Sequence, residues 1–390
     1  MTTSNNYLSL DVIQLILTQI TSKTDLYQCI FINKLFYKAT IPRLWHSLGV
    51  PAKQRSRIIS TTRGDTTTRV LKCLQLARND SCLNPIPLGH HIRHLTISSS
   101  FKVKSVVSLL QLAPMVEHLH LSTTMTDTDM KRIVVYLTRL QTLVLAADRI
   151  TDKTMDALAA HCPRLTHLDL SSCLRLTCNT FLALAKCPLE SLKINDCERL
   201  LKGASHARHL DTLTRLDIWQ CSAGPFIHSL FDPTQPPVLP LLTHISVDSL
   251  APEEDDSEDD AYLGDDSWLA PFFKTHPHLE SIHLAACVYD QDALDALHRL
   301  PRLKKISFDE SSGISSQDVR QVIYNAPLLD SLDLEECRFP RRCFPECNDE
   351  EFRQVYDLGK DEIDRIRNGA RPVFTADDDI LHESEIDDDC

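Results

Sequence analysis

Glycine is scarce in this chain, with 9 residues among 390. The sequence contains neither G-x-G-x-x-G nor G-x-x-x-x-G-K-[ST], the patterns that place backbone amides around the phosphates of dinucleotides and nucleoside triphosphates. A low glycine content instead suits a regular body built from repeated elements. A glycine-rich nucleotide-binding fold is therefore not expected.

Long apolar runs are also missing. No window of about 18 residues is apolar throughout, so we expect no membrane span and no membrane partner. The opening MTTSNNYLSLDVIQ lacks the basic segment and apolar core of a signal peptide. The 14 cysteines are therefore expected in a reducing compartment, the cytoplasm or the nucleus.

Basic residues form no clustered stripe, and the net charge of −13 is unevenly distributed. Residues 251–268 carry nine acids and no bases, and residues 348–390 carry fifteen acids and five bases. We expect the first segment to be a disordered insert and the end of the second to be a disordered tail, since such runs repel themselves and bury little. The remainder is mildly basic. Nucleic acid is not an expected partner, because its binding needs clustered basic side chains.

A nine-residue frame, L-x-x-L-x-L-x-x-C, recurs through the middle of the chain. Leu165–Cys173 reads LTHLDLSSC, for example. Counted at the central apolar residue, ten copies fall at 95, 119, 143, 168, 192, 216, 245, 282, 306 and 332. The alternating core of the frame predicts a short strand, and segments such as Thr154–Cys162 have the apolar spacing of a helix. One such unit cannot cover its own apolar edge, so neighbouring units must share a core.

This frame resembles the cysteine-containing class of leucine-rich repeats, as does the run CLRLTCNTFLALAKCPLESLKINDC. The resemblance implies an α/β solenoid, with parallel strands on the concave face and helices on the convex face. A free cysteine is small and readily buried. We therefore expect the repeat cysteines to pack in the core: Cys173, Cys197, Cys221, Cys287 and Cys337.

Residues 7–48 lack the repeat frame and read as three short helices. The first carries an apolar face behind Ser9 and Asp11. We expect Asp25 to cap a second helix at Leu26–Phe31, and a third helix to run from residue 33 to 39 and end before the proline at 42. Three short helices make a marginal core, which a partner often completes.

This N-terminal segment resembles an F-box. Its apolar residues, the Asp25–Leu26 pair and the PRLW run beginning at Pro42 follow the family pattern, whereas Ser9 replaces the usual proline and is expected to weaken the helix start. The resemblance implies a substrate-recognition subunit of an SCF (Skp–cullin–F-box) E3 ubiquitin ligase. It implies docking on the Skp adaptor, and through it on the cullin–RING ligase, by these residues: Leu8, Val12, Ile13, Leu17, Leu26, Pro42 and Trp45.

The predicted organisation has four parts: an F-box at 7–48, a connector and N-terminal cap at 49–90, about ten repeats at 91–340, and a C-terminal cap with acidic tail at 341–390. A helix is expected over 350–366 within the last part. Alternate strand residues should face outward and tile one surface. We predict that this surface holds a target protein through His120, Asp169, Lys193, Arg215, Asp217, Trp219 and His283.

No intrinsic chemistry is expected. The cysteines are explained by repeat position without a nucleophile motif. The spacing Cys337-x5-Cys343-x3-Cys347 does not match structural zinc, so no metal or other cofactor is predicted. Two alternatives remain open. One is a non-ligase interaction scaffold that uses the repeats alone, and the other is an enzyme or GTPase regulator built on a repeat body.

Overall fold

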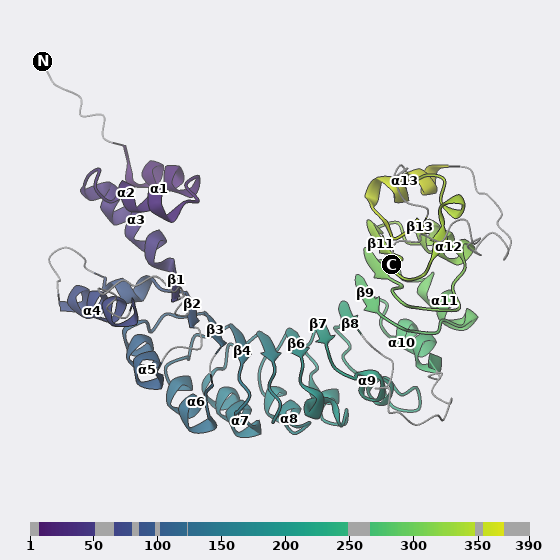
Figure 1. The fold of residues 1–390 in the computed structure, drawn as a ribbon, viewed down its shortest axis with the longest axis horizontal. Coiled ribbons are helices and arrows are strands. Elements are labelled where there is room, and N and C mark those ends of the chain that lie inside the picture. The colour runs from purple at the N-terminus through teal and green to yellow at the C-terminus, as the bar shows by residue number, and fades with distance from the viewer. Residues whose placement is uncertain are drawn as a thin grey trace, which may run out of the picture. The chain divides into compact units, whose positions relative to one another are not determined.

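A computed structural model describes residues 8–50, 66–79, 86–97, 102–122, 124–248, 266–347 and 354–369 (Figure 1). The chain divides into two compact units, Met1–Thr166 and His167–Cys390, and each is treated by itself below. Most of the predicted acidic insert and the last residues of the predicted tail, 370–390, lie outside the described residues.

Residues 8–50 contain three helices, each started by a small polar side chain. These are α1 (Leu10–Thr18), α2 (Lys23–Cys29) and α3 (Lys34–His46). Ser9 Oγ accepts a hydrogen bond from the Val12 amide at 3.3 Å, and Ser22 caps α2 in the same way. The expectation that Ser9 weakens the first helix is therefore wrong, because serine supplies a cap that proline cannot. Asp25 lies inside α2 and does not cap it.

The third helix runs further than predicted. It continues through Pro42 to His46. Ile41 is buried and Leu44 packs against the core of the bundle, so the last turns gain contacts that offset the amide that proline lacks. That core is small. Its four buried side chains are those of Ile13, Leu17, Leu26 and Ala39, and partly buried residues pack around them.

The rest of the first unit consists of repeats. Parallel strands pair in the order β1 (Ser47–Val50), β2 (His94–Ile97), β3 (His118–Ser122) and β4 (Thr142–Ala146). The other elements are α4 (Thr66–Asn79), η1 (Leu88–His91), α5 (Val103–Leu112), α6 (Asp127–Val134) and α7 (Asp152–His161). Strand β1 was not predicted, although Leu48 and Val50 take the two inner apolar positions of the frame, in register with Leu95 and Ile97.

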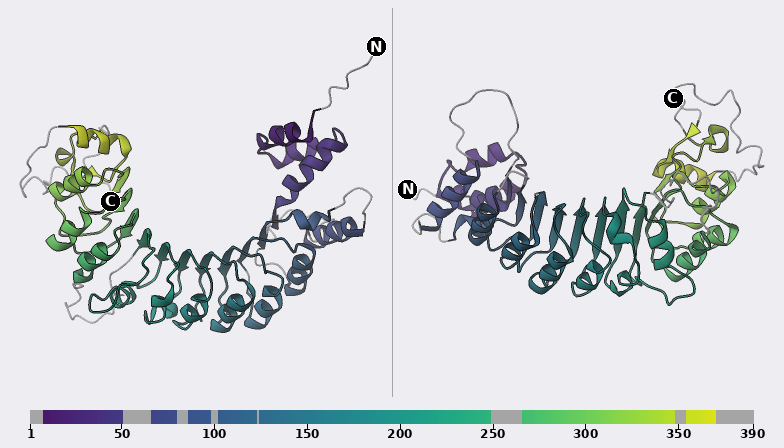
Figure 2. Two further views of the ribbon diagram at one scale, coloured as in Figure 1. Left: turned by 180° about the vertical axis from the view of Figure 1, so that it is seen from behind. Right: turned by 60° about the horizontal axis from the view of Figure 1, so that its bottom comes forward.

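The second unit continues the same architecture. Its parallel strands pair in the order β5 (His167–Ser171), β6 (Ser191–Asn195), β7 (Arg215–Trp219), β8 (His244–Val247), β9 (Ser281–Leu284), β10 (Lys305–Ser307) and β11 (Ser331–Asp333). Its helices include α8 (Thr180–Leu184), α9 (Gly224–Leu230), α10 (Leu269–Thr275), α11 (Gln291–Leu297) and α12 (Ser316–Asn325), with short 3-10 turns η2 (Glu198–Leu201) and η3 (Ala207–His209). In each unit the helices of the repeats line one side of the strands (Figure 2). The predicted leucine-rich-repeat fold is confirmed, and Leu168, Leu192 and Leu216 are buried register partners.

The repeat cysteines form a hydrogen-bonded ladder. The Cys173 amide donates to Cys197 Sγ at 3.3 Å, and the Cys197 amide donates to Cys221 Sγ at 3.2 Å. Of the five cysteines predicted to lie in the core, four are buried and Cys337 is half-buried. Each ladder position follows a residue in the left-handed backbone region, with φ between 50° and 58°: Ser172, Asp196, Gln220, Ala286, Glu310 and Glu336.

The C-terminal end of the second unit differs from the single helix predicted over residues 350–366. Among the described residues of the expected helix, Lys360–Asn368 (α13) is helical, whereas β13 (Gln354–Val355) and β14 (Asp357–Leu358) come before it. Residues 350–353 lie outside the described residues. Strand β14 pairs antiparallel with β11, and β13 pairs with β12 (Phe339–Pro340) beside η5 (Arg341–Cys343). Arg367 on α13 donates to the carbonyls of Ala326 (3.0 Å) and Ile323 (3.3 Å), which satisfies the end of α12.

The predicted acidic insert ends earlier than residue 268. Residues Asp266–Trp268 form η4, and Trp268 is buried. Its ring lies 5.8 Å from Phe231 and 5.5 Å from Phe272, so burial of a large aromatic side chain holds this end in place. Among the described helices, none combines the length and apolarity that a bilayer span requires.

Candidate functional site

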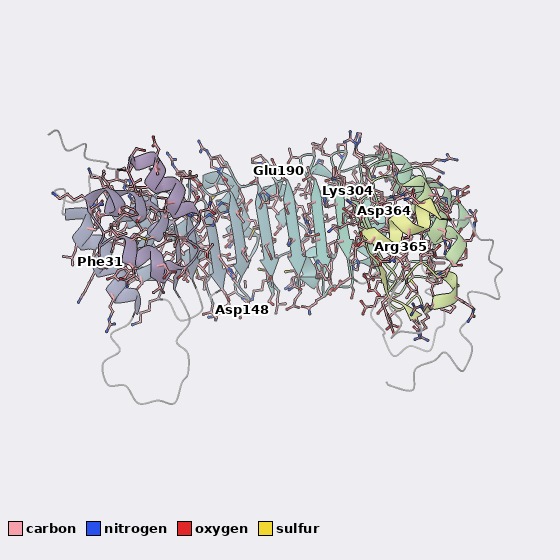
Figure 3. The ribbon with its side chains drawn as sticks, turned by 90° about the horizontal axis from the view of Figure 1, so that it is seen from above. Phe31, Asp148, Glu190, Lys304, Asp364 and Arg365 are labelled. Carbon is pink, nitrogen blue, oxygen red and sulfur yellow. The ribbon has the colours of Figure 1, made fainter. Side chains whose placement is uncertain are left out.

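The strand face of the second unit presents a row of polar residues in register. We use "strand face" for the side of β5–β11 that bears the outward-pointing residues of the frame. Figure 3 shows these strands side by side, with Glu190 and Lys304 at the edge where β6 and β10 begin. The central row of the face, one residue per strand, is Asp169, Lys193, Asp217, Ser246, His283, Ser307 and Asp333.

Asp217 lies at the centre of an ion-pair cluster. Its Oδ2 is 2.7 Å from Arg215 Nε and 3.8 Å from Lys193 Nζ. The Asp217 side chain is only 2% exposed, whereas those of Arg215 and Lys193 are 46% and 47% exposed. Asp217 was predicted to contact a target, and the structure corrects this. It lies beneath the two bases and positions them, because a buried carboxylate needs opposite charge nearby.

Trp219 is an exposed aromatic residue at the end of β7. It is 43% exposed, and its ring stacks on His283 with centroids 5.6 Å apart and planes 13° apart. His283 comes from β9, so the indole reaches across β8. The predicted residues Lys193, Arg215, Trp219 and His283 therefore lie together on one surface. Exposed Trp and Arg side chains are typical of binding hot spots.

Asp169 and His120 are the other two residues predicted to contact a target. Asp169, on β5, accepts a hydrogen bond from Ser171 and is in register with Lys193. His120, on β3, is exposed and belongs to the first unit. Nearby, His94 stacks on His118 at 4.1 Å and on His46 at 4.8 Å. The pKa of His46 is lowered by burial and then by the charge of His94, so the neutral form of His46 is favoured.

Acidic residues gather beside the last strands of the face. Ser307 Oγ donates to Asp333 Oδ2 at 3.2 Å. Burial raises the pKa of Asp309, and the charges of Asp333 and Glu310 raise it further. Sequence reasoning placed Asp309 and Asp333 outward but did not include them in the candidate site. Their alternating spacing is visible in the sequence. Their mutual repulsion is not, because it arises only when strands 24 to 26 residues apart in the sequence pair.

The residues predicted to contact an adaptor divide into two groups. Leu8 and Val12 are exposed, at 49% and 42%, and Pro42 and Trp45 are half-buried. Ile13, Leu17 and Leu26 are buried in the bundle core, so the structure corrects their assignment: they hold the helices together and offer no contact surface.

Other exposed apolar residues of the same helices were missed. Among the described residues, nine of the nineteen exposed large apolar side chains lie between residues 8 and 35, which is a marked concentration. We call this set the N-terminal apolar surface: Leu8, Leu10, Val12, Leu15, Ile16, Tyr27, Phe31, Ile32 and Leu35. Val12 and Ile16 are four residues apart on α1 and share a helix face, and Tyr27 packs edge-on against Phe31 at 5.2 Å.

A small apolar cavity of about 140 Å³ lies between the loop after α9 and helix α10, lined by residues that include Phe231, Pro236 and Phe272. His276 borders it, but its ring nitrogens are each 2.9 Å from a carbonyl oxygen, of Phe272 and of Val238, and so are engaged. In the part of the chain that the structure describes, no three His, Cys, Asp or Glu side chains form a group that could hold a metal ion.

Comparisons with known proteins report similarity only at the level of solved structures. No family model matches the sequence, and no curated protein matches it. Similar structures include the TLR13–ssRNA13 complex, at 17% identity over 62% of this chain and 32% of that chain, with a TM-score of 0.41. Another is an internalin (inlF) from Listeria monocytogenes str. 4b F2365, at 16% identity over 63% of this chain and 68% of that chain, with a TM-score of 0.40. The chain thus spans about a third of the length of the first of these. Its own repeat geometry is that of the leucine-rich-repeat fold, an architecture suited to binding other macromolecules.

Proposed function

We propose that this protein is the substrate-recognition subunit of an SCF E3 ubiquitin ligase. In this proposal the N-terminal helices dock on the Skp adaptor, and the strand face of the repeats holds a target protein. The observation that carries the proposal is the N-terminal apolar surface, which lies on a helical bundle attached directly to leucine-rich repeats.

The N-terminal bundle is suited to docking because it has more large apolar side chains than its core buries. Four side chains are buried in that core, whereas nine large apolar side chains of residues 8–35 are exposed to solvent. Contiguous exposed apolar residues usually mark a protein interface. A partner that covers them would also stabilise a bundle whose own core is marginal.

The strand face supports the second half of the proposal. Lys193, Arg215 and Trp219 are accessible and lie on rigid strands, which hold a contact surface in a defined geometry. The contribution of the protein to ubiquitin transfer would then be proximity, since a bound target is held at high effective concentration beside the E2 enzyme that the cullin–RING arm brings. The chain itself is proposed to be non-catalytic and to act in the cytoplasm or the nucleus.

The decisive experiment is co-purification of the full chain with a Skp-type adaptor. We expect the wild-type chain to retain the adaptor, and the double variant Ile16→Asp/Phe31→Asp to lose it by at least tenfold, because two charges then enter an apolar interface. Both residues are exposed, at 40% and 66%, so the variant is expected to stay folded.

The matched control is Leu76→Asp on α4, where an equally apolar side chain is 71% exposed outside the N-terminal apolar surface. It should retain the adaptor. A wild-type chain that fails to bind the adaptor would reject the ligase role and favour the alternative, an interaction scaffold that uses the repeats alone.

A further inference from the structure

Three acceptor oxygens on the strand face of the second unit lack a hydrogen-bond donor. The Oδ1 atoms of Asn195, Asp217 and Asp248 are shielded from solvent and have no partner among the described residues. Asp217 is 1% exposed, and only its other oxygen, Oδ2, is paired with a base. Folded proteins pair nearly all such groups, because an unpaired buried acceptor is destabilising. Three of them on one surface point to a ligand rich in N–H donors.

These oxygens belong to residues on Trp219's own strand and on, or directly after, the two strands beside it. Asn195 on β6 is the register partner of Trp219, and Asp217 lies two residues before it on the same side of β7. Asp248 follows β8, and its Oδ2 accepts from the amide of Gln220, next to Trp219. Asp217 stays beneath Lys193 and Arg215, whereas Asn195 and Asp248 are half-buried, so a ligand reaches these two acceptors with less displacement of the surface.

An aromatic face beside unpaired acceptors is the environment that an arginine side chain requires. The guanidinium group is planar and stacks on an indole, which attracts it through the electron-rich ring face. Its five N–H groups donate in the plane, toward acceptors at the rim of the ring. His283 stacks under Trp219 and holds the indole in position.

Negative charge continues from Trp219 toward the last strands. Carboxylates at or just after the ends of β8, β10 and β11 include Asp248, Asp309 and Asp333. The raised pKa of Asp309, which follows from burial and then from Asp333 and Glu310, supports a concentration of negative potential at this point. An acidic or phosphorylated ligand would be repelled at these strands, and the carboxylate of Asp217 offsets one of the two positive charges of Lys193 and Arg215.

We propose that this face binds a basic, extended segment of a partner protein, with an arginine over Trp219 and a second basic residue near Asp309 and Asp333. The inference rests on the proposed function, in which the strand face is the target-binding surface. From β7 to β10 or β11 is three or four strand spacings, or ~14–19 Å, which an extended chain covers in about four to six residues. The two basic residues should therefore be separated by about five positions.

The test uses pools of randomised nine-residue peptides and the full chain, with binding measured by fluorescence anisotropy at 50 and 500 mM NaCl. One pool has arginine fixed at two positions five residues apart, and matched pools carry glutamate or alanine there. We expect the arginine pool to bind at least tenfold more tightly than either, and to weaken at high salt. Equal binding of the arginine and alanine pools, or no binding by any pool, would overturn the inference.

Variants then locate the site. Trp219→Ala should weaken the arginine pool about 5- to 30-fold, the range expected from loss of a cation–π contact and its packing. Asp309→Asn should weaken it about 3- to 10-fold and reduce the salt dependence. The controls are Leu328→Ala, an exposed apolar residue before β11, and Glu190→Gln at the opposite edge of the face (Figure 3). If Trp219→Ala behaves like Leu328→Ala, the arginine subsite is refuted.

Adaptor capture separates this inference from the proposed function. Trp219→Ala should bind the Skp-type adaptor as the wild-type chain does, because Trp219 lies outside the N-terminal apolar surface. Adaptor binding without preference for arginine peptides would reject the basic-segment inference and leave the ligase role standing. Preference for arginine peptides without adaptor binding would reject the ligase role alone.

Discussion

Arg320 is a buried cation that forms an ion pair, hydrogen bonds and an aromatic contact with the C-terminal turns. It is 0% exposed on α12, and its guanidinium makes a two-point contact with Glu346 at 3.0 and 2.7 Å. It also donates to the Cys343 carbonyl at 2.8 Å and lies 5.3 Å from the centre of the Phe344 ring. One side chain thus ties the last long helix to the C-terminal turns.

Removal of that charge should strongly destabilise the second unit. Arg320→Met leaves Glu346 and a buried carbonyl without their donor, so we expect a loss of about 3–5 kcal/mol in the free energy of unfolding. Urea denaturation monitored by circular dichroism measures it. Arg338→Met is the control, because Arg338 is 72% exposed in its ion pair with Glu336 and should change stability by less than about 1 kcal/mol. Similar losses in the two variants would contradict this account.

Residue-level errors in the sequence analysis arise where burial decides the role. Asp217 is a charged residue on a strand, and Leu17 is a leucine on an amphipathic helix. Both residue types are common at contact surfaces, which is why both were predicted to bind a partner. The strand alternation places Asp217 outward correctly, but the two bases that cover it come from its own strand and the neighbouring one. Leu17 faces the other helices. Sequence periodicity predicts which side of a helix or strand a residue lies on. Whether that side is exposed depends on which other side chains pack against it.

At the level of elements, helix starts are set by single side chains. Ser9 caps α1, and Asn33 Oδ1 accepts from the amides of Leu35 and Phe36 at 2.9 and 3.0 Å to start α3. In a bundle with four buried core side chains, each cap is a sizeable fraction of the total stability.

Ser9→Ala should therefore loosen the N-terminal bundle by about 1 kcal/mol. Hydrogen exchange read by mass spectrometry should show faster exchange in α1, with no change in the repeats of the second unit. If docking stabilises the bundle, adaptor addition should restore the protection. Unchanged exchange in α1 would mean that the Ser9 cap contributes nothing.

Neighbouring repeats are joined by a carboxylate that caps the next helix. Asp127, in the first turn of α6, accepts from the Thr151 amide at 2.8 Å and from the hydroxyls of Thr151 and Thr154 at 2.8 and 2.7 Å. Burial raises its pKa, but these hydrogen bonds outweigh that effect, so the pKa is lowered overall. The ionised form thus stabilises the start of α7.

Asp127→Ala should lower the free energy of unfolding of the first unit by about 1–3 kcal/mol, because it leaves the Thr151 amide and two hydroxyls without their acceptor. Thermal denaturation provides the measurement. Asp148→Ala removes an exposed carboxylate from the same unit (Figure 3) and should leave the melting temperature nearly unchanged. Equal melting temperatures for the two variants would argue against the inter-repeat cap.

At the scale of the whole molecule, stability depends on several cysteine thiols remaining protonated. Burial raises the pKa of Cys221 to about 11, that of Cys337 to about 12 and that of Cys347 to about 11, from an ordinary value of 9.0. The unfolded chain then loses thiol protons at a lower pH than the folded chain. Stability from these groups is fully present below pH 9 and is lost as the pH rises toward 11 to 12.

The urea midpoint of the full chain should therefore fall between pH 8.5 and 10.5 under reducing conditions. The variant Cys337→Ala should show a shallower fall, because one of the shifted thiols is gone. A midpoint that stays constant over this range would exclude the thiols as a source of pH dependence. Thiol labelling at pH 8 should modify the exposed Cys73 before any repeat cysteine.

The repeat fold could be predicted almost completely from the sequence, because each strand repeats one local pattern. The ends of the repeat array could not. Strand β1 keeps only the inner alternation of the frame, at Leu48 and Val50, and the antiparallel strand β14 does not follow the frame; each pairs with the neighbouring strand. The candidate site was predicted in part: Lys193, Arg215 and Trp219 come together as expected, but the unpaired oxygens beside them are visible only in three dimensions.

The left-handed residue before each repeat cysteine has a bearing on how the protein could be engineered. A side chain in that backbone region costs about 1 kcal/mol or more, and this glycine-poor chain bears the cost at six turns, five of them before a repeat cysteine and one before Ser311. Ala286→Gly should therefore raise the melting temperature, since no side-chain contact of consequence is lost. Ala157→Gly in the middle of α7 should lower it. A designer seeking a more stable repeat protein would thus add glycine at the very turns where the natural sequence omits it.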